Sequence, residues 1–525
     1  MSHLAPVMFG SLVVAMLVGF PVAFTLGGLG LAFGYFAMSQ GFVNPEFMGN
    51  LPLRLFGIVS NELLLSIPFF TFMGAILERC GLAEDLLEGT GQLFGSRPGG
   101  LGFAVIIVGA ILGAITGTVA ASVIAMGVIS LPIMVRYGYD MRYATGVIAA
   151  SGTITQLIPP SLVLVVLADQ LGRSVGDMYL GAIGPSLLQT GIFLLYTAAI
   201  VVFKPQWVPP LPPEARTERG AKLVKRVLWG MLPSIVLIFL VLGTLFMGLA
   251  TPTEAGALGA FGGMVLAAMH KRLSLKLVWQ AMDTTMRVTS MVIFILLGST
   301  VFSLVFQGVD GHIWIEEMLS NLPGGPVGFL IAVNVFIFFL AFFLDFFEIA
   351  FIVVPLLAPV AEKLGIDLIW FGVLLCVNMQ TSFMHPPFGF ALFYLRGVAD
   401  QIHKSGAVSK PILSRDIYLG AIPWVAMQLV LVAVVIFWPQ SVTAFLDKAP
   451  AVNTDDVHIE MQIEDVGSDP VSPVSTGGSE AATAEPGSGG LQVPAPASES
   501  EADPAQALKQ ALENPSPADQ PASTR

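Results

Sequence analysis

Two pairs of adjacent prolines interrupt long apolar stretches of this sequence, and they limit what the chain can fold into. Pro159-Pro160 and Pro386-Pro387 each stand inside a run that is apolar enough to cross a membrane. Proline lacks a backbone donor and clashes with the preceding helical turn, so neither run can be one continuous helix. In hydrocarbon the freed carbonyls have no water to bind, so protein or an aqueous cavity must supply partners. Two broken helices therefore predict a buried binding site like that of a secondary transporter.

The composition supports an integral membrane protein. Of the 525 residues, 55% are hydrophobic and 11% are charged. The net charge of −12 belongs almost wholly to residues 447–525, which hold 14 acids and 3 bases, whereas the rest holds 22 acids and 21 bases. This Pro-, Ala- and Ser-rich segment is poor in aromatic residues and cannot bury enough apolar surface to fold alone. We expect a disordered acidic tail, with a partner-binding tail as the alternative.

The second half of the chain repeats landmarks of the first at a constant spacing, called the repeat offset below. Three pairs share it: Pro132 and Pro359, Gly138 and Gly365, and Pro159 and Pro386. The apolar runs give each half five crossings and one re-entrant hairpin, the hairpins at about 101–135 and 330–360. An odd number of crossings makes the halves inverted relative to each other. We predict an all-α polytopic membrane protein whose two inverted repeats, 1–203 and 228–440, are joined by a cytoplasmic linker at 204–227.

Local signals predict some helix boundaries. The motif Gly19-Phe-Pro21 should divide the apolar stretch 7–38 into two short helices. The run 55–77 should be one crossing, and the polar stretch 78–97 an amphipathic arm at the membrane interface. Glu254 lies at a predicted helix start, where a carboxylate stabilises the N-terminus.

The distribution of basic residues predicts the orientation. With the N-terminus outside, the cytoplasmic segments hold 18 of the 24 Lys and Arg residues. These segments are 78–98, 135–142, 204–227, 270–287 and 396–416. The opposite orientation would contradict the positive-inside rule. The first hairpin should then enter from the cytoplasm and the second from outside.

Four clusters of small polar residues should meet near the middle of the membrane. The first hairpin tip and first break carry Thr116, Gly117, Thr118, Ser122, Ser151, Gly152, Thr153, Thr155 and Gln156. The second tip and second break carry Asp345, Glu348, Asn378, Gln380, Thr381, Ser382 and His385. Hydroxyl, amide and carbonyl oxygens suit an exchangeable alkali cation, and helix N-termini favour an anion. The clusters predict cation-coupled uptake of an anionic solute, although a membrane hydroxyl often bonds only its own backbone or a neighbouring helix.

Three ionisable residues stand in the second cluster. Asp345 is the strongest functional candidate, because an ionisable group at membrane depth is costly. Glu348 lies nearly one turn later and should cap or pair. For His385 we favour a hydrogen-bonded structural role over proton transfer.

No familiar catalytic or nucleotide-binding motif is present in the sequence. It lacks a P-loop, a His-Glu-x-x-His, a Gly-x-Ser-x-Gly and paired cysteines. We therefore expect neither an enzyme nor an ATP-driven pump, and no nucleic-acid partner. A membrane-embedded enzyme that uses Asp345, Glu348 and His385 is the alternative from another class.

Several motifs together resemble the large membrane subunit of tripartite ATP-independent periplasmic (TRAP) transporters. They are Gly-Phe-Pro-Val-Ala-Phe (19–24), Thr-Gly-Thr-Val-Ala-Ala-Ser (116–122), Ile-Pro-Pro-Ser (158–161), Ala-Thr-Pro-Thr-Glu-Ala (250–255), Phe-Leu-Asp-Phe-Phe-Glu (343–348) and Pro-Pro-Phe-Gly-Phe-Ala-Leu-Phe-Tyr-Leu-Arg-Gly (386–397). The resemblance spans residues 5–440 and implies an elevator-type fold in the bacterial inner membrane, with a fixed scaffold and a moving domain. It implies Na⁺ coupling with no other cofactor, a smaller membrane subunit, and a periplasmic binding protein that delivers a carboxylate-bearing solute.

The resemblance also implies site residues. One Na⁺ site would lie where the first tip meets the first break, at Thr116, Gly117, Thr118, Gly152, Thr153 and Thr155. The other would use Asp345, Gln380, Thr381, Ser382, His385 and Pro386. We expect Ser122, Gln156 and Asn378 to face the solute.

This sequence departs from the family pattern at two places. His385 stands where the family commonly has a threonine, and the acidic tail lies outside the pattern. No small-subunit segment precedes residue 7, so we expect that subunit to be a separate chain. The alternative within this fold is a stand-alone cation-coupled anion symporter.

Overall fold

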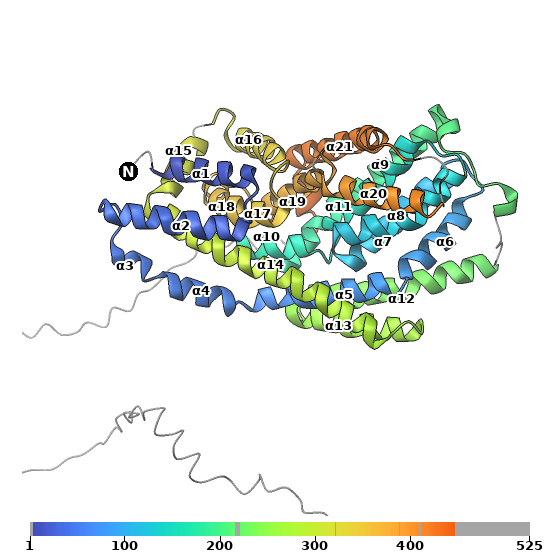
Figure 1. The fold of residues 1–525 in the computed structure, drawn as a ribbon, viewed down its shortest axis with the longest axis horizontal. Coiled ribbons are helices and arrows are strands. Elements are labelled where there is room, and N and C mark those ends of the chain that lie inside the picture. The colour runs from blue at the N-terminus through green and yellow to red at the C-terminus, as the bar shows by residue number, and fades with distance from the viewer. Residues whose placement is uncertain are drawn as a thin grey trace, which may run out of the picture. The chain divides into compact units, whose positions relative to one another are not determined.

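The structure is a computed structural model that describes residues 4–215, 221–320, 322–387, 389–406, 408 and 411–446. The chain divides into two units, Met1–Pro450 and Ala451–Arg525, and only the first contains described residues. The predicted tail at 447–525 lies outside them. The described residues form helices and connecting turns without a strand, as predicted (Figure 1).

The first apolar stretch forms two helices, α1 (Leu4–Val18) and α2 (Val22–Ser39). They are separated where the Gly-Phe-Pro motif predicts a break. Gly19 has a φ of 91°, a left-handed conformation that favours glycine, and Pro21 precedes the first turn of α2.

The other helices of the first half are α3 (Pro45–Met48), α4 (Leu51–Val59), the 3₁₀ helix η1 (Glu62–Leu65), α5 (Ser66–Arg79), α6 (Leu82–Phe94), α7 (Gly100–Thr116), α8 (Val119–Arg136), α9 (Met141–Thr153), the 3₁₀ helix η2 (Ile154–Gln156), α10 (Leu162–Gln170) and α11 (Val175–Phe203). The connection and second half contain η3 (Pro205–Trp207), η4 (Pro213–Ala215), α12 (Ala221–Phe246), α13 (Pro252–Met269), α14 (Leu275–Gly308), α15 (Gly311–Ser320), α16 (Gly325–Leu340), α17 (Phe346–Glu348), the π-helix η5 (Ile349–Val353), α18 (Val354–Lys363), α19 (Leu368–Met379), the 3₁₀ helix η6 (Gln380–Met384), α20 (Phe390–Lys404), α21 (Ser414–Phe437) and α22 (Gln440–Thr443).

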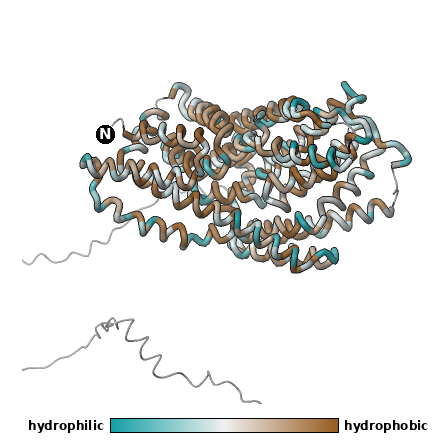
Figure 2. The backbone as a smooth tube through the Cα atoms, viewed as in Figure 1, coloured by the Kyte–Doolittle hydropathy of each residue, from teal (hydrophilic) through white to brown (hydrophobic). Residues whose placement is uncertain are grey.

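Six described helices are long and apolar enough to cross a membrane, or up to eight if each of two bent pairs is one span. Hydrophobic colour covers most of their length (Figure 2). The 34 residues of α14 make a helix of roughly 51 Å, longer than the roughly 30 Å hydrocarbon core.

Helices α2 and α14 pack closely because glycines lie between them. A Cβ added at Gly30 would stand 2.9 Å from the Phe302 nitrogen, and one at Gly298 would stand 2.4 Å from the Ala23 carbonyl oxygen. Small residues that let backbones approach are a main source of packing between membrane helices.

Three boundaries differ from prediction. The stretch 55–77 is not one straight crossing, because α4 and η1–α5 are bent by 43°. Asn61 causes the restart: its side chain accepts from the Leu63 N–H and so caps a new turn. The helix α12 begins at Ala221, inside the predicted linker. The second arm of the second hairpin combines α17, a π-helix and α18 rather than one regular helix.

Matched positions in the two halves have the same local conformation. Gly138 and Gly365 have φ values of 78° and 72°. Asp140 and Asp367 then cap α9 and α19 with their side chains. Both of these helices end in a 3₁₀ turn just before the proline pair.

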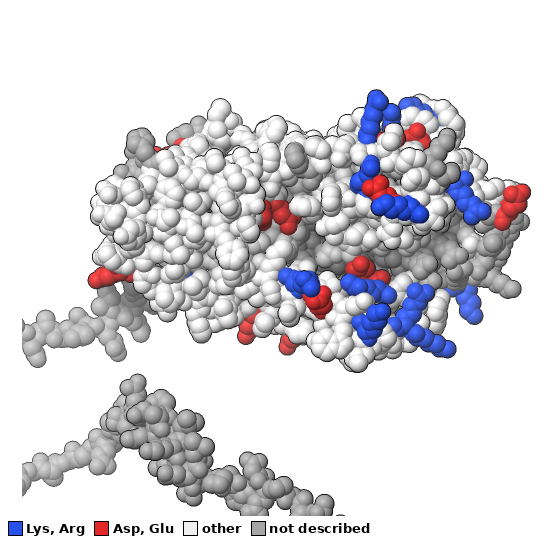
Figure 3. Space-filling model, viewed as in Figure 1, with Lys and Arg blue, Asp and Glu red and all other residues white. Residues whose placement is uncertain are grey.

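The five segments predicted to be cytoplasmic lie at one end of this unit. Four contacts join them: Leu211 N–H to the Gly95 carbonyl at 2.7 Å, Asp140 N–H to the Trp207 carbonyl at 2.9 Å, Arg79 Nη2 to Thr284 Oγ1 at 3.2 Å, and Arg142 Nε to Asp416 Oδ1 at 3.4 Å. Lys and Arg side chains gather toward this end (Figure 3).

Candidate functional site

The first break is buried against the first hairpin, α7–α8. A Cβ at Gly113 on α7 would stand 2.9 Å from the Thr155 Cα. A Cβ at Gly152 would stand 2.3 Å from Val123 Cγ2 on α8. Any larger side chain at these positions would push the hairpin away from the break.

The hairpin tip reaches the end of the first break. Gly117 ends α7 with a φ of 62°, and its Cβ position lies 3.9 Å from the Pro160 carbonyl oxygen. Thr118 follows as the residue before α8 and makes no side-chain bond to that helix. The side chain of Thr116 lies outside the described part of the chain.

Two hydroxyls of the first break, those of Thr153 and Thr155, donate to their own helix. Thr155 Oγ1 donates to the Gly152 carbonyl at 2.7 Å and lies 3.1 Å from Ser122 Oγ. Thr153 Oγ1 donates to the Ala150 carbonyl at 2.9 Å. A hydroxyl used in this way keeps its oxygen lone pairs for an acceptor or ligand role. These bonds are compatible with both readings of the sequence, backbone bonding and cation binding.

Buried polar atoms at both breaks lack a partner among the described residues. Gln156 is 1% exposed, and neither of its side-chain amide atoms is bonded. Ser151 Oγ and Asn378 Oδ1, at positions related by the repeat offset, are also unpartnered. Leaving such a group unsatisfied costs about 1–3 kcal/mol.

The two acidic residues of the second tip cap one helix. Asp345 Oδ1 accepts from the Phe346 N–H at 2.7 Å, and Glu348 Oε2 accepts from the Asp345 N–H at 3.0 Å. The same reciprocal arrangement joins Thr251 and Glu254 at the start of α13. The predicted capping roles of Glu254 and Glu348 are confirmed.

Aromatic rings join the second tip to the second break. The Phe346 and Phe383 rings lie 6.1 Å apart, and His385 stacks on Phe342 at 4.2 Å with Phe338 edge-on at 4.3 Å. His385 is 1% exposed, and neither ring nitrogen has a partner among the described residues. The hydrogen-bonded role expected for it finds no partner among the described residues, where the ring packs between aromatic neighbours.

The second break repeats the hydroxyl pattern of the first. Ser382 Oγ donates to the Met379 carbonyl at 2.6 Å, and the repeat offset relates this bond to the one from Thr155 to Gly152. Thr381 Oγ1 donates to the Asn378 carbonyl at 2.8 Å. Pro386 follows the end of η6.

The two breaks also meet each other. Thr153 Oγ1 lies 3.6 Å from Met384 Sδ, and Cys376 Sγ lies 3.5 Å from the Gln156 carbonyl oxygen. The polar residues of the two breaks therefore share one buried region, whereas Asp345 and Glu348 of the second tip are half-buried.

Two glutamines outside the predicted set bond to the breaks. Gln189 on α11 donates from Nε2 to Gln380 Oε1 at 2.8 Å. Gln428 on α21 donates from Nε2 to Thr153 Oγ1 at 3.1 Å.

The sequence carries a signal for both glutamines. The motif Tyr-Leu-Gly-Ala-Ile occurs at 179–183 and again at 418–422. Gln189 and Gln428 each stand at the same distance after it. The two motifs are spaced more widely than the repeat offset, so a comparison based on that offset does not align the glutamines.

Cavities flank both breaks. One of about 550 Å³ is lined in part by Pro159 and Ser186. Another of about 310 Å³ is lined in part by Asn334 and Asn378, and the Asn378 amide donates to the Asn334 carbonyl at 2.8 Å.

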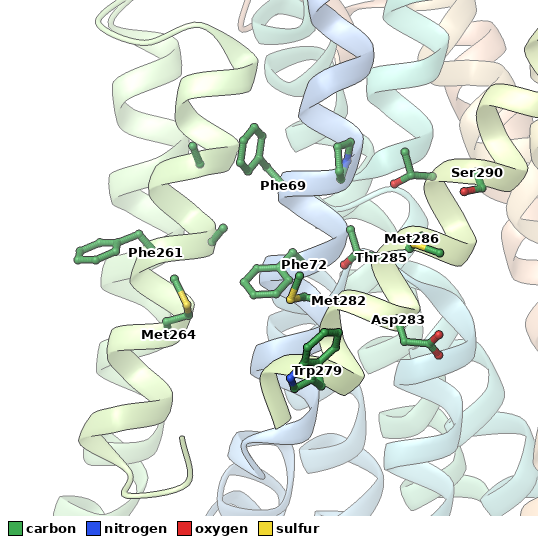
Figure 4. Close-up of a pocket in the computed structure, with 14 residues that line it drawn as sticks. Phe69, Phe72, Phe261, Met264, Trp279, Met282, Asp283, Thr285, Met286 and Ser290 are labelled. Carbon is green, nitrogen blue, oxygen red and sulfur yellow. The ribbon is translucent and has the colours of Figure 1, made fainter. Parts of the chain in front are cut away.

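A groove of about 740 Å³ lies between α5, α13 and α14 (Figure 4). Half of its lining residues are aromatic or methionine, including Phe69, Phe72 and Phe261. Trp279 and Met286 are 64% and 70% exposed, so the groove opens on the outer surface of these helices. It contains none of the predicted site residues.

The sequence matches one family of known proteins. The sequence model of the tripartite ATP-independent periplasmic transporter, DctM component, matches residues 9–441. The C4-dicarboxylate TRAP transporter large permease protein DctM of Rhodobacter capsulatus is 29% identical and covers 83% of this chain and 97% of its own length. The protein of the same name from Pseudomonas aeruginosa is 30% identical, covering 75% and 89%.

Another relative, the isethionate TRAP transporter permease protein DctMQ of Oleidesulfovibrio alaskensis, extends well beyond the matching region. It is 29% identical over 78% of this chain, and the matching part spans only 63% of that protein. Among solved structures, the Alcanivorax borkumensis YdaH transporter matches with a TM-score of 0.55 at 14% identity, covering 82% of this chain and 98% of that one, which shows a shared fold. The chain therefore belongs to the DctM component family of the tripartite ATP-independent periplasmic transporters, and it is a multi-pass inner-membrane transport subunit rather than an enzyme.

Proposed function

We propose that this chain couples Na⁺ influx to the uptake of a carboxylate-bearing solute. The observation that carries the proposal is the pair of buried breaks, whose hydroxyls donate to their own helices at matched positions. Their oxygen lone pairs, together with carbonyls freed at the prolines, are hard ligands suited to a weakly held alkali cation.

The Na⁺ sites in this proposal lie where each hairpin tip meets its break. The first comprises Thr116, Gly117, Thr118, Gly152, Thr153 and Thr155. The second comprises Asp345, Gln380, Thr381, Ser382, His385 and Pro386. Ser122, Gln156 and Asn378 face the solute, and the unpartnered amide atoms of Gln156 and Asn378 support this role.

Transport in this proposal follows an elevator mechanism in a pair of inverted repeats. The hairpins and breaks move together as one body, and α2, α5, α13 and α14 form the fixed scaffold. Close backbone packing between α2 and α14 supports a rigid scaffold.

A smaller membrane subunit and a periplasmic binding protein complete the transporter in this proposal. Three names of relatives refer to C4-dicarboxylate, 2,3-diketo-L-gulonate and sialic acid transport, and each of these solutes carries a carboxylate, whereas isethionate, in the name of another relative, carries a sulfonate. For this chain we propose a solute that carries a carboxylate, without naming a single compound.

Reconstitution tests the proposal. The chain and the smaller subunit are placed in proteoliposomes, and uptake of labelled C4-dicarboxylates and sugar acids is measured with their binding protein outside. Uptake should require an inward Na⁺ gradient and stop when K⁺ replaces Na⁺. Equal uptake in K⁺ would contradict Na⁺ coupling.

Omitting the binding protein tests the rival reading. A stand-alone symporter would retain Na⁺-driven uptake without that protein, whereas the proposed tripartite system would lose it. Vesicles without the chain provide the background in both experiments.

A further inference from the structure

The last long helix of each half packs against the broken helix of the other half. Helix α11 packs against α19, and α21 packs against α9. The second contact is close, since a Cβ at Gly146 would stand 2.4 Å from the Gly420 carbonyl oxygen. Each break is therefore held in part from across the molecule.

The two glutamine bonds are equivalent in the duplicated sequence. Gln189 and Gln428 occupy the same position after the two Tyr-Leu-Gly-Ala-Ile motifs. Their partners, Thr153 and Gln380, are related by the repeat offset, as the proline pairs are. Thus one bond occurs twice, and each time it joins the last helix of one half to the break of the other.

Each glutamine uses only one end of its side-chain amide. Gln189 and Gln428 are 1% and 0% exposed, and Oε1 of each lacks a partner among the described residues. Exchanging oxygen and nitrogen on both Gln189 and Gln380 would reverse the direction of their bond and still leave each amide with one unbonded end. If these side chains only filled space in the core, an apolar side chain would be more stable there, because an unsatisfied buried amide is destabilising.

We propose that Gln189 and Gln428 are positioning residues that couple the two cation sites. Gln189 holds Gln380 of the second site, and Gln428 holds Thr153 of the first. Helix α11 also contacts the first break, where Ser186 Oγ donates to the Leu157 carbonyl at 3.1 Å, and α21 also packs against η6 of the second. A cation that orders one site therefore also orders a helix that contacts the other. The two cations then bind cooperatively. This inference rests on the proposed Na⁺-coupled function.

Methionine substitutions test the coupling. Gln189→Met and Gln428→Met keep the side-chain length but remove the amide. Na⁺ dependence of uptake is measured in proteoliposomes with the complete transporter, and Na⁺-dependent thermal stabilisation is measured on the purified chain. Each variant should raise the half-saturating Na⁺ concentration about two- to tenfold, the factor expected for one net hydrogen bond. The Hill coefficient should fall toward one.

A matched control separates this effect from general loss of glutamine. Gln440→Met makes the same change at an exposed position on α22 and should leave Na⁺ dependence unchanged. Gln189→Asn and Gln428→Asn provide a second pair if the methionine variants fold poorly. They keep an amide in the core but shorten it by one methylene, and should shift Na⁺ dependence in the same direction.

Double variants test whether each glutamine acts through its partner. Gln428→Met combined with Thr153→Val should have no larger effect than the stronger single change. The same should hold for Gln189→Met combined with Gln380→Met. Additive effects in both pairs, or wild-type Na⁺ dependence in both single variants, would overturn the coupling.

Measurements on the wild-type chain distinguish a failure of the coupling from a failure of the proposed function. Thermal stabilisation is measured with Li⁺, Na⁺ and K⁺ in turn. If no alkali cation stabilises the wild type and uptake ignores Na⁺, both the proposed function and the coupling fail. If Na⁺ stabilises the wild type and the glutamine variants equally, only the coupling fails.

Discussion

At the two breaks, short polar side chains bond to the helix that carries them. Thr155 and Ser382 donate to carbonyls one turn back, at equivalent positions. This bonding occupies the hydroxyl protons and leaves the oxygens available to accept. A residue type that looks merely structural can in this way form part of a cation site.

Replacing Asp345 tests the charge of the second site separately from its cap. Asparagine caps helices about as well as aspartate, so Asp345→Asn should change stability by less than about 1 kcal/mol. Loss of the negative charge should nevertheless raise the half-saturating Na⁺ concentration of uptake about tenfold or abolish uptake. Thermal unfolding and uptake are measured on the same preparation. Wild-type Na⁺ dependence would remove Asp345 from the site.

His385 is expected to tolerate a hydroxyl. Both ring nitrogens are unpartnered among the described residues, so His385→Thr should retain Na⁺-dependent uptake. Stability should fall by roughly 1 kcal/mol for each aromatic pair lost with Phe338 and Phe342. Uptake assays and thermal unfolding measure the two effects. Complete loss of uptake in a folded variant would show a specific role for the imidazole.

Residue roles were predictable where the partner is near in sequence. Glu254 and Glu348 cap helices through residues three positions away, and both roles follow from the local motif. The repeated Tyr-Leu-Gly-Ala-Ile motif marks Gln189 but not its partner, because the bond to Gln380 spans 191 residues and depends on how two helices pack. The aromatic surroundings of His385 were missed for the same reason.

At the scale of elements, the first hairpin is held against its break by direct backbone approach. Glycines at 113 and 152 permit this approach, and matched backbone conformations recur before α9 and α19. The helix breaks followed from proline and glycine. The 43° bend between α4 and η1–α5 was missed although its cap at Asn61 is local. Asn61 Nδ2 also donates to Asp169 Oδ1 at 2.6 Å, a contact that the local sequence does not indicate.

Adding one methyl group tests the contact between hairpin and break. Gly113→Ala places a Cβ 2.9 Å from the Thr155 Cα and should destabilise the protein by about 1–3 kcal/mol, as overpacking does. Na⁺-dependent uptake should fall severalfold. Gly191→Ala is the control, because no atom lies within 4 Å of the added Cβ. Equal behaviour of the two variants in uptake and unfolding would contradict the close packing.

At the scale of the whole first unit, the basic residues mark one end. The five segments that the positive-inside rule assigns to the cytoplasm are joined there by hydrogen bonds and an ion pair. Charge counts predicted this grouping well, since they depend only on which loops share a side. The number of crossings is harder to predict, because hairpin arms and spanning helices have similar length and hydropathy.

Labelling of single cysteines tests the orientation. Both natural cysteines, Cys80 and Cys376, are buried. Gln40→Cys should react from outside intact cells with a membrane-impermeant maleimide, whereas Glu214→Cys should react only after permeabilisation. Both positions are exposed in the structure. The reverse labelling pattern would invert the proposed topology.

The central claim is that solute and Na⁺ enter together through this chain. The most direct test measures labelled Na⁺ influx and labelled carboxylate uptake in the same proteoliposomes, with the smaller subunit and binding protein present. We predict that adding the solute-loaded binding protein starts both fluxes, and that they keep a constant ratio as the solute concentration changes. Solute accumulation with no added Na⁺ influx would contradict the account.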